Sequence, residues 1–89
     1  MYAPYVKTTG YNITATASQV VPYTPDRSYL AIFNPSAADL YVALSNTTPD
    51  AADYFTIVAD GHFEFTCPIA SGVWLKGEGA QVAVLAEAK

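Results

Sequence analysis

The sequence predicts an all-β fold, a single antiparallel β-sandwich of seven or eight strands with a jelly-roll-like architecture. Residues that favour strands are abundant, because 21 of the 89 residues are β-branched (9 Thr, 8 Val and 4 Ile) and another 12 are aromatic. Short runs of these residues alternate with turn-forming residues at the spacing typical of sandwiches and barrels. No longer stretch follows the 3.6-residue period of an amphipathic helix.

We divide the chain into an extended arm over residues 1–10 and a sandwich domain over residues 11–89. The arm is rich in tyrosine, and Pro4 and Gly10 make it better suited to extended chain than to a packed strand. The strands that we expect after the arm cover residues 12–17, 19–21, 28–34, 40–44, 54–58, 62–66, 73–76 and 81–86.

Turn chemistry separates these strands. Asn34 and Pro35 end the strongest strand, because proline fixes φ and asparagine bonds to its own backbone. The pair Asp60-Gly61 predicts a hairpin between the strands over 54–58 and 62–66. The run Gly77-Glu78-Gly79 predicts a second hairpin, between the two last strands. One helical turn is expected after Pro49, where two alanines follow each other.

Alternation along each strand assigns one side to the core, because successive side chains of a strand point to opposite faces. The expected core is aliphatic and phenylalanine-rich and consists of Ile13, Leu30, Ile32, Leu40, Val42, Leu44, Phe55, Ile57, Phe63, Phe65, Val73, Leu75, Val82 and Val84. These side chains would fill the gap of about 10 Å between two packed sheets.

The opposite side of several strands is aromatic where a water-facing side should be polar. We predict that these residues form contacts between subunits, since only 13% of the chain is charged against about 25% in an average soluble domain. Taken singly, each of them is explained by a scattered surface position or by cover from the protein's own loops and arm. The set comprises Tyr29, Phe33, Tyr41, Tyr54 and Trp74, and Tyr2 and Tyr5 of the arm either reach onto a neighbour or belong to a frayed end.

Arg27 is the single arginine of the chain and immediately precedes the strongest strand. It either pairs with a carboxylate of a neighbouring subunit, to which the planar guanidinium group is suited, or is a solvated strand end. We include it among the candidate interface residues.

Charge excludes several classes of partner. The net charge is −4 and only four residues are Lys or Arg, so we expect neither a nucleic-acid partner nor an anionic membrane surface. No uncharged run is apolar enough to cross a bilayer as a helix. The single cysteine, Cys67, excludes an internal disulfide, and we expect it to be a small buried hydrophobe.

The sequence contains no enzyme signature, and we expect neither catalytic residues nor a cofactor. His62 and Glu64 share a strand face with Asp60 two residues before them, which is the pattern of a cupin-like metal site. The chain has no second histidine, however, and a water-facing strand is sufficient to explain these residues. We therefore predict no metal.

The segment Arg27-Ser28-Tyr29-Leu30-Ala31-Ile32-Phe33-Asn34-Pro35-Ser36, followed by the strand over residues 40–44, resembles small β-sandwich accessory proteins of tailed bacteriophage virions. Gly61-His62-Phe63-Glu64-Phe65 and the closing residues 82–87 resemble the later parts of such chains. The resemblance covers residues 27–88 and leaves residues 1–26 unmatched. It differs from the usual pattern where Asp60-Gly61 stands in place of a Pro-Gly turn.

This resemblance implies a structural virion protein, a capsid decoration or cement protein that binds across adjacent major capsid subunits, commonly as a trimer. It offers no catalytic or ligand position. The acidic charge favours the outer surface of the capsid over the DNA-facing side. The alternative is a glycan- or receptor-binding module of a phage head or tail fibre, with Trp74 and tyrosine rings as sugar platforms.

Overall fold

The computed structural model of the protein describes residues 6–65 and 67–88 and contains eight strands and one turn of 3-10 helix. The strand number and the helical turn after Pro49 are as predicted. The helical turn η1 covers Ala51–Asp53, and the Asp50 amide donates to Asp53 Oδ2 at 2.8 Å. The strands are β1 (Lys7–Ile13), β2 (Ser18–Val21), β3 (Tyr29–Phe33), β4 (Leu40–Leu44), β5 (Phe55–Ile57), β6 (His62–Glu64), β7 (Val73–Lys76) and β8 (Gln81–Ala88).

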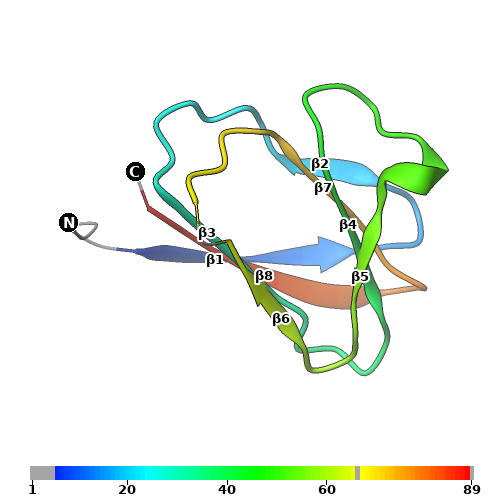
Figure 1. Ribbon diagram of the computed structural model, residues 1–89. Coiled ribbons are helices and arrows are strands. Elements are labelled where there is room, and N and C mark those ends of the chain that lie inside the picture. The colour runs from blue at the N-terminus through cyan, green and yellow to red at the C-terminus, as the bar shows by residue number, and fades with distance from the viewer. Residues whose placement is uncertain (1–5, 66, 89) are drawn as a thin grey trace.

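The strands form two four-stranded antiparallel sheets that pack face to face (Figure 1). Sheet A has the order β1-β8-β3-β6, and sheet B has the order β2-β7-β4-β5. The first strand pairs with the last, the second with the seventh, the third with the sixth and the fourth with the fifth. This nested pairing is that of a jelly roll, which confirms the predicted sandwich.

Both predicted hairpins are wrong. β5 belongs to sheet B and β6 to sheet A, and likewise β7 belongs to sheet B and β8 to sheet A. The tight turn before β6 does form, since the Gly61 amide donates to Val58 O at 2.9 Å and Asp60 adopts a left-handed φ of 61°. After this turn the chain crosses from sheet B to sheet A. β5 and β6 can lie in different sheets because both sheets bury their apolar sides in the same core.

The sandwich begins earlier than the expected boundary at residue 11. Residues 7–10 belong to β1 and pair with β8, with Thr9 opposite Leu85. Thr9 and Tyr11 are strand formers that lie on the side of β1 facing the core, which explains why this part of the expected arm joins the sheet. The strand expected over 12–17 correspondingly ends at Ile13. Residues 1–5, with Tyr2 and Tyr5, lie outside the described residues.

The core between the sheets consists largely of the residues that alternation assigned to it. Eight of the expected core side chains are buried: Ile13, Leu30, Ile32, Leu40, Val42, Ile57, Val73 and Leu75. Leu44, Phe55 and Phe65 are half-buried and pack against this cluster.

The assignment was wrong in β8, where Ala83 and Leu85 are buried and Val82 and Val84 lie on the outer side. Strand pairing determines which side of β8 faces the core, because Leu85 stands opposite Ile32 and Ala83 stands opposite Tyr11. The small side chain of Ala83 leaves room for the larger ring of Tyr11.

Phe63 is also not buried, although it stands opposite Ile32 on the inner side of sheet A. It lies on the edge strand β6, where the sandwich is open, and its side chain is exposed. The Phe63 ring packs against the rings of Phe55 and Phe65, with centroid separations of 5.4 and 4.8 Å. The three rings therefore close the open side of the core between the two edge strands.

Candidate functional site

The aromatic residues predicted to form an interface lie on two different surfaces. Tyr29 and Phe33 are on the outer face of sheet A, and Tyr41 and Trp74 are on the outer face of sheet B. Tyr54 precedes β5 and lies against the sheet B face through Lys76. The predicted set is therefore not one continuous surface. Its role in contacts between subunits stays a prediction.

The aromatic residues of the sheet B face gather around Lys76. The Lys76 Nζ atom lies 4.5 Å from the centroid of the Tyr54 ring and 5.9 Å from that of Tyr41. The Trp74 Nε1–H donates to Ser45 O at 3.0 Å, and the three aromatic side chains are half-buried. The Tyr41 and Tyr54 rings and the Trp74 N–H thus have partners in their own chain.

Two tyrosines of this face have a raised pKa. For Tyr41 the main cause is burial of the ring, and the charge of Glu78 and a 3.3 Å hydrogen bond from the hydroxyl to Glu78 Oε2 add to it. For Tyr54 burial again comes first and the charge of Asp53 second. Both causes favour the neutral hydroxyl over the phenolate.

The outer face of sheet A is different, because apolar side chains there remain open to solvent. Phe33 stands opposite Val84, and Val82 lies two residues before Val84 in β8 on the same face. The side chains of Phe33 and Val82 are 37% and 41% exposed. Gly10 of β1 stands opposite Val84 on its other side and carries no side chain that would cover it. We call Phe33, Val84 and Val82 the apolar row.

Polar contacts border the apolar row. The Tyr29 hydroxyl donates to Glu64 Oε2 at 2.5 Å, and this hydrogen bond raises the pKa of Tyr29. The Phe33 ring stacks on the imidazole of His62, with centroids 5.7 Å apart. Between these two pairs, Ala31 is fully buried although it lies on the outer side of β3.

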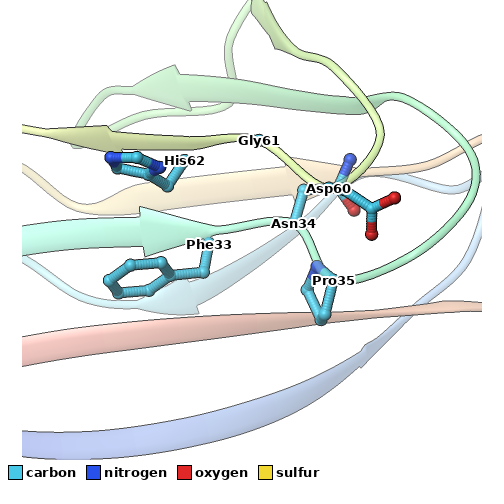
Figure 2. Close-up of a pocket in the computed structure, with 6 residues that line it drawn as sticks. All are labelled: Phe33, Asn34, Pro35, Asp60, Gly61 and His62. Atoms are coloured by element: carbon cyan, nitrogen blue, oxygen red, sulfur yellow. The ribbon is translucent and has the colours of Figure 1, made fainter.

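A shallow pocket of about 220 Å³ opens at the end of β3 and β6 and contains the Phe33–His62 stack (Figure 2). Figure 2 shows the two rings one above the other on one side and the carboxylate of Asp60 on the other. Asn34, Pro35 and Gly61 complete the lining.

The Asn34 side chain belongs to the scaffold of this pocket. Its amide nitrogen donates to Ala38 O, Ile57 O and Val58 O at 2.8, 3.0 and 3.1 Å, and its Oδ1 accepts from the Ser36 amide. The predicted turn at Asn34 is confirmed, and in addition this residue ties β3 to the end of β5. Its hydrogen-bonding groups are used within the chain, so they are not free to bind a ligand.

The metal pattern does not assemble. Glu64 bonds to Tyr29, while Asp60 and His62 line the pocket. Within residues 6–65 and 67–88, no three His, Cys, Asp or Glu side chains lie close enough together to hold a metal ion. In the same part of the chain, no helix has the length and apolar composition needed to cross a membrane.

Two expectations for single residues are wrong. Arg27 is 2% exposed, and its guanidinium donates to Glu87 Oε1 at 2.8 Å, to Ile69 O at 2.9 Å and to Ser71 O at 3.0 Å. It is therefore not a solvated strand end, and its own chain encloses it so that no guanidinium surface is left for a neighbour. Cys67 is exposed, because the strand before it ends at Glu64 and the thiol lies in a loop.

Sequence reasoning missed the outward position of Val82 and Val84, since Val84 and Leu85 are equally suited to a core. A usable signal lies in Ala83, which stands opposite Tyr11, because the inner partner of a large ring must be small. It also missed the half-buried pairing of Arg27 with Glu87. A strand end with one arginine and a distant glutamate is too weak a pattern to predict it.

Over residues 6–65 and 67–88, the fold and these surfaces define a small jelly-roll β-sandwich in which the outer face of sheet A is apolar and open. The chain is similar to a solved structure of Bacillus endospore appendages, which form a novel family of disulfide-linked pili, with a TM-score of 0.58 and 14% sequence identity. The match covers 96% of this chain and 85% of that chain. No protein-family model and no curated protein matches the sequence. At this identity the likeness shows the fold alone.

Proposed function

We propose that this protein is a non-enzymatic structural subunit that works in many copies within a larger protein assembly. The observation that carries the proposal is the apolar row on sheet A, in which Phe33 and Val82 are open to solvent and Val84 has a glycine beside it. A small domain with few charges gains stability when such a surface is covered by another subunit. The sheet B face does not contribute to this argument, because its aromatic residues have partners in their own chain.

The finer form of the proposal is capsid decoration. In this form, copies of the chain bind the outer surface of a phage capsid across adjacent major capsid subunits, with a trimer as the expected oligomer. Its support is the resemblance over residues 27–88 and the net charge of −4, which favours a surface away from nucleic acid. Multivalent attachment to a lattice would multiply weak single contacts.

The similar appendage structure is also that of a subunit that works in repetition, which supports a structural role. The disulfide linkage of those pili, however, cannot be assumed for this chain. This chain has one cysteine, Cys67, and one thiol can join only two copies. A continuous disulfide-linked polymer needs at least two thiols per subunit, so we propose non-covalent association for this chain.

Light scattering over a concentration series tests self-association. We expect an oligomer for the natural sequence and a shift to monomer for the double variant Phe33→Ser/Val82→Ser. Val58→Ser is the matched control, because Val58 is 63% exposed and lies outside the apolar row. A protein that remains monomeric at all concentrations, or a control that dissociates equally, contradicts the proposal.

Co-sedimentation tests the finer form. We expect the purified protein to sediment with phage heads that lack it, and not with host cells. The double variant should bind such heads less than the Val58→Ser control. Sedimentation with cells and not with heads would instead favour the second candidate.

The second candidate is a glycan-binding module, and the pocket is the observation that favours it. An exposed Phe33–His62 stack lies beside the carboxylate of Asp60 at one end of the sandwich, and saccharide sites combine ring faces with polar acceptors. Titration with saccharides, followed by NMR, should then shift Phe33 and His62. Unchanged spectra contradict this candidate and leave the structural one intact.

A further inference from the structure

The four edge strands of the sandwich are protected to different degrees. A sheet edge presents unpaired amide and carbonyl groups, and natural proteins blunt such edges by shortness, bulges, proline or charge. β5 and β6 are three residues long, and β6 carries His62 and Glu64. β2 has an irregular register between Gln19 and Val21 and is followed by Pro22.

β1 lacks these features. It is seven residues long, contains no proline and runs in unbroken register against β8 from Lys7 to Ile13. Lys7, at one end, is its single charged residue. Within residues 6–65 and 67–88, β8 is the only strand paired with β1, so the other edge of β1 has no backbone partner.

We propose that β1 pairs with β1 of a second copy of this chain, antiparallel and around a twofold axis at Gly10. This inference rests on the proposed structural role, because it names a contact through which copies join. A twofold contact joins two copies, so it predicts a dimer in place of the trimer that the resemblance implies. Sheet A would then continue across the axis as one eight-stranded sheet. Main-chain hydrogen bonds supply the affinity in this mode of association.

One antiparallel register uses the whole length of β1. Centring the pair on Gly10 pairs all seven residues, whereas any shift leaves residues unpaired. In this register Thr8 stands opposite Asn12 of the second copy, and Lys7 stands opposite Ile13 of the second copy. The two lysines are therefore at opposite ends of the ladder and no like charges face each other.

The residue on the axis fits this arrangement. Gly10 is exposed, and a Cβ added there would meet no atom within 4 Å in the described structure. Gly10 also lies beside Val84 on the outer face of sheet A. Pairing at Gly10 would therefore bring the apolar rows of the two copies toward each other on one continuous surface.

Oxidative cross-linking tests the register. In a Cys67→Ser background, Gly10→Cys places two thiols directly opposite each other at a Cα separation of about 4.5–5.5 Å, within the range of a disulfide. Asn12→Cys is the matched control, because it is exposed and on the same face of the same strand but away from the axis. We expect at least about tenfold more disulfide dimer from Gly10→Cys, since pairing raises the effective thiol concentration.

A mixture of Thr8→Cys and Asn12→Cys proteins provides a second readout. It should give mixed dimers, while each protein alone gives few. Equal cross-linking of Gly10→Cys and Asn12→Cys overturns the inference. The inference is also overturned if light scattering shows an oligomer but Gly10→Cys does not cross-link. That result would still support the proposed structural role. A monomer without cross-links overturns both.

Discussion

The two outer faces of the sandwich carry aromatic residues of similar number and have opposite character. On sheet B, the ring of Tyr54 and the indole of Trp74 are held by Lys76 and by Ser45 O, and Ala43 beneath them is fully buried. On sheet A, Phe33 is supported by His62 on one side and remains 37% exposed.

This difference teaches that an aromatic residue on the water side of a strand does not by itself mark an interface. What matters is whether its own chain supplies a partner. A long side chain such as that of Lys76 covers apolar surface with its stem and keeps its charge in water. Val84 next to Phe33, and Gly10 on the far side of Val84, have no such side chain, so the surface on sheet A stays open.

The largest expected effect is a difference in the free energy of unfolding between substitutions on the two faces. We expect Trp74→Ala to lower the free energy of unfolding by about 2 kcal/mol, because it removes a half-buried ring and leaves Ser45 O without its donor. Phe33→Ala on the other face should cost less than about 1 kcal/mol in the dissociated subunit, since much of the ring is already in water.

Urea denaturation of both variants at a concentration where the subunit is dissociated measures this difference. Trp74→Phe serves as a control that keeps a ring and removes the indole N–H. Equal losses for Trp74→Ala and Phe33→Ala would contradict the distinction between the faces.

Much of the fold follows from the two-residue period of the sequence. In Leu30, Ile32, Val42 and Leu75 the alternation is strong, and each of them is fully buried. Turn residues indicate where the chain reverses, but they do not tell which sheet receives the next strand. This is why the turn at Asp60 was predicted and the pairing of β5 with β6 was wrong.

The surfaces were less predictable because they depend on contacts between distant residues. Leu85 and Val84 are similar in hydrophobicity, and only the position of Ile32 opposite Leu85 turns Val84 outward. Arg27 and Glu87 are 60 residues apart in sequence and form a half-buried ion pair that no local pattern indicates. Local patterns thus identified the aromatic residues but not their partners.

A smaller effect should come from the lysine at the centre of the sheet B face. Lys76→Met removes the charge and keeps most of the stem, so it isolates the contact of the ammonium group with the rings. We expect a loss of about 0.5–1 kcal/mol in the free energy of unfolding. A double-mutant cycle with Tyr54→Leu should show coupling of similar size, given the 4.5 Å separation. Additive effects would mean that the stem alone covers this face.

The smallest effect concerns alkaline pH. Tyr41 and Tyr54 on sheet B and Tyr29 on sheet A have a raised pKa, so the folded chain keeps their protons at a pH where the unfolded chain loses them. The unfolded tyrosine titrates near 10, and stability should fall as the pH rises above about 10 and through the folded pKa values.

Tyr→Phe variants test how much the tyrosines of each face contribute to the loss of stability at alkaline pH. The double variant Tyr41→Phe/Tyr54→Phe removes two of the titrating groups and Tyr29→Phe removes one. The urea midpoint of the double variant should therefore fall less steeply above pH 10 than that of Tyr29→Phe. Tyr23→Phe is a useful control, because Tyr23 is 56% exposed and lies outside both faces. If all variants lose stability in parallel with the natural sequence, the loss of stability at alkaline pH arises from other groups. The partners of these hydroxyls would then contribute little to the pH dependence of stability.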